Sequence, residues 1–192
     1  MTQEQANYII QQLKNKGIIF NDGLTKAEIS VIEQKFTIRF PPDLQLFLET
    51  ALPTSQRFVN WRAALTSNEE TSAINSSLNW PFEGMQFDLE NNHFWHDEWG
   101  VKPIALKEQI EIAKKHYNSY PKLIPIYGHR FIPSAPCESG NPVFSVYQMD
   151  IIYYGFDLAD YFSNEFHFEL PSFFEVPAEP LRKIRFWSEV VE

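Results

Sequence analysis

The sequence predicts an α+β fold in a single domain, with a mixed, mostly antiparallel sheet flanked by helices and a helical N-terminal third. Three observations lead to this prediction. Apolar residues recur at helical spacing through the first 52 residues, short apolar runs bounded by proline and glycine fill residues 121–155, and another helical pattern follows. Helices followed by strands and a last helix are typical of α+β domains, and 192 residues suit one domain.

Three short helices are predicted in the N-terminal third. The first ends at Gly17, which suits the position after a helix C-terminus. The second begins at a capping box formed by Thr25 and Glu28, and the third opens with Pro41 and Pro42. The apolar faces of the three are Ala6, Ile9, Ile10 and Leu13; Ile29, Ile32 and Phe36; and Leu44, Phe47, Leu48 and Ala51.

The middle of the chain is less regular. Residues 57–61 have the composition of a short strand, and Thr66 with Glu69 suggests a capping box that starts a weaker helix. Residues 80–103 hold three of the five tryptophans, and we expect a strand at 85–89 with the rest an ordered aromatic loop.

The last third alternates strands and helices. A helix is expected over 106–120, followed by strands at 123–127 and 130–132. Residues 143–147 and 150–154 predict a β-hairpin about Gln148-Met149, and a helix follows Gly155. Residues 182–190 fit a helix or a strand.

Composition excludes several classes of function. Sixteen basic against 25 acidic residues give a net charge of −9, which disfavours nucleic-acid binding. The single cysteine, Cys137, rules out an internal disulfide framework and fits a reducing compartment. The first 17 residues hold no apolar run of signal-peptide or membrane length, so we expect a cytoplasmic protein without membrane contact. The seven glycines are scattered singly and form no phosphate-binding loop, and we expect no cofactor and no metal.

Three stretches resemble a known family. They are LTKAEISVIEQKFTIRFPPDLQLFLETA at 24–51, FWHDEWG at 94–100, and PKLIPIYGHRFIPSAPCESGNPVFSVYQMDIIYYGFDLADYF at 121–162. Together they are similar to the SUKH superfamily, which includes the fungal cell-wall-assembly regulator and killer-toxin-resistance family. The resemblance covers about residues 20–166, with an N-terminal helix and a C-terminal extension packed on it, and it departs from the family at Ala51-Leu52-Pro53-Thr54, where an Asn-Gly-Gly element is common.

The resemblance implies a non-enzymatic protein-binding domain, because the family has no shared catalytic motif. Bacterial members are thought to be immunity proteins that bind and neutralise toxins, often nucleases, and we favour this function. Fungal relatives imply the alternative of an intracellular scaffold that regulates wall assembly. The residues we expect to contact a partner are Tyr127, His129, Arg130, Tyr153, Tyr154, Asp157 and Asp160. Asp157 and Asp160 would present an acidic face to a basic toxin, and they also suit the first turn of a helix.

Two further motifs leave an enzymatic alternative open. His93-x-x-His96 followed by two acidic residues suggests a metal-dependent hydrolase, but the spacing is not the zinc-protease spacing and the surroundings predict a loop. His129 and Cys137 could form a base and a nucleophile, although a structural role is the simpler interpretation. The aromatic cluster is Trp80, Phe82, Trp95 and Trp99; we assign Trp99 to the core and leave Trp95 open between core and interface.

Overall fold

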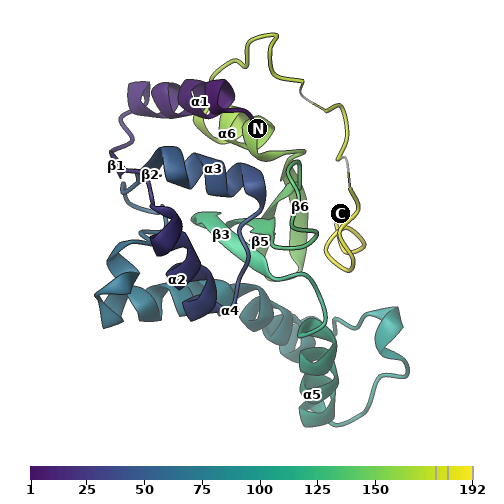
Figure 1. Cartoon of the computed structure of the whole chain (residues 1–192). Helices are drawn as coiled ribbons and strands as arrows, with labels where there is room; N and C mark the ends of the chain where they lie inside the picture. The colour runs from purple at the N-terminus through teal and green to yellow at the C-terminus, as the bar shows by residue number, and fades with distance from the viewer. Residues whose placement is uncertain (176, 181, 192) are drawn as a thin grey trace.

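A computed structural model describes residues 1–175, 177–180 and 182–191 of the chain, and it confirms the α+β class (Figure 1). The helices are α1 (Gln3–Asn15), α2 (Lys26–Phe36), α3 (Pro42–Thr50), α4 (Asn68–Asn91), α5 (Leu106–Tyr117) and α6 (Leu158–Phe166), with short 3₁₀ helices η1 (Ala63–Leu65) and η2 (Asp97–Trp99). The strands are β1 (Phe20–Asp22), β2 (Ala51–Pro53), β3 (Leu123–Tyr127), β4 (Arg130–Pro133), β5 (Val143–Tyr147) and β6 (Asp150–Gly155).

The central sheet has four antiparallel strands in the order β3-β4-β5-β6, while β1 and β2 pair separately. Two-residue loops join β3 to β4 and β5 to β6, and Gly128 and Gln148 take positive φ angles of 55° and 57° in them. Such left-handed residues let a tight turn follow the twist of its strands. The predicted hairpin about Gln148-Met149 is therefore confirmed.

The sheet separates two hydrophobic cores. Ile132 and Val143 face the first core, where they meet buried residues of α1, α2, α3 and α6. Phe131 and Phe144 face the second core, which α4, α5 and the C-terminal segment close. Successive strand residues point to opposite faces, so adjacent residues of β4 and of β5 serve different cores. Figure 1 shows α1, α3 and α6 on one side of the sheet and α4 and α5 toward the other.

The helical N-terminal third follows the prediction closely. All four predicted face residues of α1 are buried, as are the three of α2. Leu44, Phe47 and Leu48 of α3 are buried as expected, but Ala51 is the first residue of β2 and not the last turn of the helix. Pairing of Ala51 with Asp22 of β1 explains why the helix stops one residue early, at Thr50.

The predicted capping box starts α2. The Thr25 hydroxyl accepts from the Glu28 amide at 3.2 Å, and a Glu28 carboxylate oxygen accepts from the Thr25 amide at 2.8 Å. The Arg62 side chain adds an ion pair to Glu28 at 2.5 Å and donates to the carbonyls of Asp22 and Gly23. This cluster ties β1, the start of α2 and the segment before η1 together.

Glu28→Gln is expected to lower the free energy of unfolding at pH 7 by about 1–2 kcal/mol. Hydrogen bonds from Arg62 and Thr25 lower the Glu28 pKa to about 2 from an ordinary value of 4.5. The folded pKa is below the unfolded one, so the stabilisation by ionised Glu28 is complete above pH 4.5 and is lost as the pH falls toward about 2. Urea unfolding at pH 7, 4 and 2.5 measures this. A difference between the two proteins that stays constant with pH would contradict it.

The prediction for the middle of the chain is wrong in three places. Residues 85–89 are not a strand, because α4 continues through the buried Pro81 to Asn91. The helix begins one residue later than expected, with Ser67 as the cap that accepts from the Glu70 amide at 3.2 Å. Residues 57–61 form no strand, and only Phe58 makes a single bridge to Tyr127.

The C-terminal segment from 182 to 191 is neither a helix nor a regular strand. It forms turns that place Ile184, Phe186 and Trp187 against the second core at 0–1% exposure, and Val191 bridges to Ile151 at the outer edge of β6. In Figure 1 this segment descends beside β6. None of the helices among the described residues combines the length and the apolar character needed to cross a bilayer.

Candidate functional site

The seven residues predicted to contact a partner are separated by the fold. The strand register places Tyr127, Arg130 and Tyr154 on the side of the sheet that faces α6. Tyr153 points to the opposite side, where its ring packs on Phe144 at 5.2 Å between centroids. Adjacent strand residues necessarily face opposite ways, so these four do not share a face.

Of the three residues on the α6 side, Arg130 is buried and the two tyrosines are half-buried. Arg130 is buried, and its Nε is 2.9 Å from a carboxylate oxygen of Glu165. The guanidinium also lies over the Tyr154 ring at 3.7 Å from its centroid. The half-buried Tyr127 ring packs against Phe166 at 5.3 Å. Arg130 in particular is a residue of the core.

Asp157 and Asp160 begin α6. Asp157 is the N-cap and accepts from the Asp160 amide at 2.8 Å, while the Asp160 carboxylate accepts from the Phe156 amide at 2.8 Å. The Asp157 carboxylate therefore binds an amide of the first turn that the helix leaves without a partner, and the Asp160 carboxylate reaches back to an amide just before the helix. This confirms the interpretation of the two residues as acids of the first helical turn.

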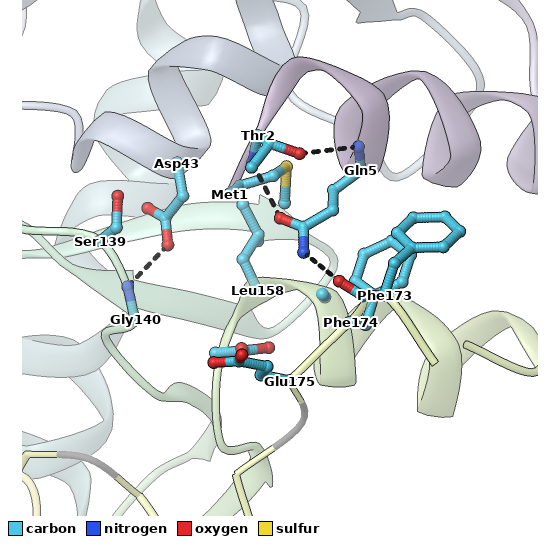
Figure 2. A pocket seen from close by; sticks show the side chains of 12 residues that line it. Met1, Thr2, Gln5, Asp43, Ser139, Gly140, Leu158, Phe173, Phe174 and Glu175 are labelled. Atoms are coloured by element: carbon cyan, nitrogen blue, oxygen red, sulfur yellow. Dashed lines mark hydrogen bonds between the residues drawn. The ribbon is translucent and has the colours of Figure 1, made fainter. Parts of the chain in front are cut away.

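Asp157 also lines an acidic pocket of about 440 Å³, together with Asp43 and Glu175, below the first residues of the chain (Figure 2). The buried Asp43 accepts from the amides of Gly140 and Leu44, both at 2.9 Å. Burial raises the pKa of Asp43 and of Asp157, although hydrogen bonds from backbone amides act in the opposite direction. Asp43 thus joins α3 to the β4–β5 connection, while Asp157 caps its own helix, and both are structural roles that need no ligand.

The histidines and the cysteine are not assembled into a catalytic group. His93 is exposed in the segment after α4, and Nε2 of His96 lies 3.6 Å from a carboxylate oxygen of Glu189. Cys137 lines a different cavity from His129. Within residues 1–175, 177–180 and 182–191, no three His, Cys, Asp or Glu side chains are grouped so as to hold a metal ion.

A different surface has the features of a binding site. Two adjoining cavities of about 570 and 290 Å³ share Arg57, Ser77 and Gly128 and run along α4. We call them together the α4 groove. One wall is α4 from Glu70 to Glu83, and the other is formed by residues 57–60, the β3–β4 turn and the tip of the β5–β6 hairpin.

The groove exists because α4 docks closely on the β5–β6 hairpin. Three α4 residues spaced by four make the contacts: Trp80, Gly84 and Asp88. The Trp80 indole donates to a β5 carbonyl at 3.0 Å, and Asp88 accepts from the Met149 amide at 2.7 Å. Between them a Cβ on Gly84 would come within 2.6 Å of the Gln148 Cα, so only glycine fits without rearrangement. These contacts fix the orientation of the helix beside the sheet.

The opposite wall centres on Arg57. Its carbonyl accepts from the Gly128 amide at 2.9 Å, and its guanidinium lies over the Tyr127 ring at 4.5 Å from the centroid. His129 follows at the turn, and burial together with the Arg130 and Arg57 charges lowers its pKa below 6.5. The neutral imidazole is therefore the favoured form of His129 at pH 7.

Two aromatic side chains mark the end of the groove near the hairpin. Trp80 is 41% exposed and Tyr147 is 57% exposed, and their ring centroids are 6.2 Å apart. The predicted aromatic cluster is thus divided: Trp99 is buried in the second core as expected, Trp95 is half-buried against it, and Trp80 is at the surface.

Of the seven residues predicted to contact a partner, His129 alone lines the α4 groove, and Trp80 of the predicted aromatic cluster also lines it. Arg57 and Tyr147 were missed, because each belongs to a short segment whose position relative to α4 depends on contacts distant in sequence. The signal available for Trp80 and Tyr147 was residue type alone, since tryptophan and tyrosine are enriched at interface hot spots but are also ordinary core residues.

Comparison of the chain with protein-family models, curated proteins and solved structures finds no match. A relationship to the SUKH superfamily is therefore an expectation drawn only from the three stretches quoted above.

Proposed function

We propose that this protein is a non-enzymatic binding domain that recognises a protein partner through the α4 groove. The partner we propose is a toxin domain, as the SUKH resemblance implies for bacterial immunity proteins. Binding of the toxin to the groove would keep the toxin from its own substrate. The protein would act in the cytoplasm, by steric and electrostatic blocking of the toxin's active site.

The observation that carries the proposal is the exposed pair Trp80 and Tyr147 beside Arg57. Tryptophan, tyrosine and arginine are the residue types most enriched among interface hot spots. Here they line a groove whose walls are held by hydrogen bonds and close packing, so little ordering is required on binding. Rigid aromatic anchors that are already in place favour recognition of a macromolecular surface.

The overall charge supports a basic partner. A net charge of −9 accelerates association with a basic domain, whereas contacts inside the groove determine how long the complex lasts. The acidic surface therefore affects mainly the association rate, whereas Trp80 and Tyr147 affect mainly the dissociation rate. Many nucleases are basic because they bind nucleic acid, and a nuclease toxin would fit this charge.

Tyr147→Ala is expected to abolish protection in a co-expression test. The gene would be expressed beside candidate toxin domains encoded next to it, and growth would be scored. Because Tyr147 is 57% exposed, its removal should leave the fold intact while the affinity for the toxin falls about 30-fold, as for a hot-spot residue. The affinity is measured on purified proteins by calorimetry.

Phe87→Ala is the matched control. Phe87 is also on α4 and is 45% exposed, but it does not line the groove. This variant should protect as well as the wild type. Protection by no neighbouring toxin, with the protein folded and abundant, would contradict the toxin proposal, and equal protection by all variants would exclude the groove.

A further inference from the structure

Arg57 differs from every other arginine of the chain. The sequence has six arginines, and five of them have a glutamate oxygen within 4 Å. These pairs are Arg39–Glu33, Arg62–Glu28, Arg130–Glu165, Arg182–Glu138 and Arg185–Glu98. Among the residues that the structure describes, no carboxylate pairs with Arg57. The Arg57 guanidinium is therefore a positive charge that lines a cavity and can pair with an anionic group of a ligand, in a protein whose net charge is −9.

The backbone of Arg57 is held in an unfavourable conformation. Its φ is 76°, in the left-handed region that residues with a side chain seldom adopt. The hydrogen bond from the Gly128 amide and the bridge between Phe58 and Tyr127 hold it there. The surrounding structure therefore imposes this conformation on an arginine, where glycine would be less strained.

The conformation directs the guanidinium into the groove. It rests on the face of Tyr127 on one side, and a Cβ on Gly128 would come within 2.7 Å of its Nη2. The glycine thus leaves the space that the guanidinium fills. Stacking on an aromatic ring restrains the planar group and leaves its N–H edges available as donors.

We propose that Arg57 binds a carboxylate side chain, Asp or Glu, of the protein partner, while a neighbouring aromatic side chain of that partner packs on Trp80 and Tyr147. This inference rests on the proposed function and adds the chemistry that the groove selects. A guanidinium offers two parallel N–H donors to one carboxylate, the geometry of strong charge-assisted pairs.

The charges around the groove favour a carboxylate over a phosphate. Arg57 is the one arginine that lines it, His129 has a lowered pKa, and Glu70 and Glu83 lie along α4. A single positive charge matches a singly charged carboxylate, while two nearby glutamates oppose a dianion. An acidic anchor residue is also compatible with a partner that is basic overall.

Short peptides test the site without any toxin. The probes are tetrapeptides Gly-Glu-Phe-Gly and Gly-Gln-Phe-Gly with acetylated and amidated ends, titrated into ¹⁵N-labelled protein. The Glu peptide should shift the Gly128 amide and Trp80 indole signals, and the Gln peptide should bind at least tenfold more weakly, because it lacks the charge. Equal binding of the two peptides, no binding, or tighter binding of inorganic phosphate would overturn the inference.

Arg57→Gly separates binding from folding. Glycine suits a φ of 76°, so the urea midpoint should stay at or near the wild-type value while binding of the Glu peptide falls at least tenfold. Arg39→Gln removes one positive charge at a 73% exposed side chain outside the groove and should bind as the wild type does. A large drop in the midpoint for Arg57→Gly would show that Arg57 is structural and would refute the site.

The two proposals can fail separately. If a toxin is neutralised by the wild type and equally by Arg57→Gly, the carboxylate site is wrong and the proposed function stands. If the Glu peptide binds at Arg57 but no neighbouring toxin is neutralised, the carboxylate site stands and the toxin proposal is wrong.

Discussion

Arg130→Met is expected to destabilise the protein by about 3–5 kcal/mol, because it leaves the Glu165 carboxylate without its partner in the interior. The side chains of Arg130 and Glu165 are only 10% and 12% exposed. Arg130 also donates to the Ser145 hydroxyl at 2.7 Å and stacks on Tyr154. All of these contacts are lost together, and water cannot easily replace them.

The double variant Arg130→Met, Glu165→Leu provides the internal control. Replacing both charges by apolar residues removes the uncompensated carboxylate, so the double variant should recover most of the stability lost in either single variant. Urea unfolding of the four proteins gives the coupling energy. If the free energy lost in the double variant equals the sum of the losses in the two single variants, the pair is not coupled and the prediction is wrong.

The expected loss of stability gives Arg130 a structural role in place of the predicted partner contact. Sequence reasoning placed it on a partner-binding face, and loss of protection in an Arg130 variant would look like loss of a contact. The buried ion pair gives a different explanation, in which protection is lost because the domain unfolds. Arg57, at the surface of the α4 groove, is the arginine whose replacement should change binding without changing stability.

Trp187→Ala is the second change with a large expected effect, a loss of about 3–5 kcal/mol in the free energy of unfolding. Trp187 is 1% exposed, packs against Phe186 at 5.1 Å between centroids and donates from its indole to the Pro121 carbonyl at 2.7 Å. Truncation leaves a large cavity in the second core and a carbonyl without its donor.

Phe173→Ala is the matched control for this prediction. Phe173 precedes the same C-terminal segment but is 43% exposed, so its truncation should cost less than about 1 kcal/mol. Urea denaturation followed by far-UV circular dichroism measures both variants. Comparable losses in the two would show that the C-terminal segment does not close the second core.

Local features of the fold were predictable because they depend on residues a few positions apart. The capping box at Thr25 and Glu28, the turn at Gln148 and the acids that begin α6 are interactions of this kind. The buried faces of α1 and α2 also followed from periodicity alone.

The errors occur where distant contacts decide the outcome. Pro81 and the aromatic residues after it suggested a loop and a strand, yet α4 continues because Trp80, Gly84 and Asp88 dock on the hairpin. The C-terminal segment gave no clear pattern because its aromatic residues fill a core built by other elements.

The sequence by itself determined the α+β class, the positions of most helices and strands, and the acidic charge, since these follow from composition and short-range spacing. Only the tertiary structure decided that Arg130 lies in the core, that Arg57 lies at the surface without a described carboxylate partner, and that Trp80 and Tyr147 meet. The physical reason is that a side chain's environment depends on which strand or helix packs beside it. Strand register and the docking of α4 bring those neighbours from positions distant in the chain.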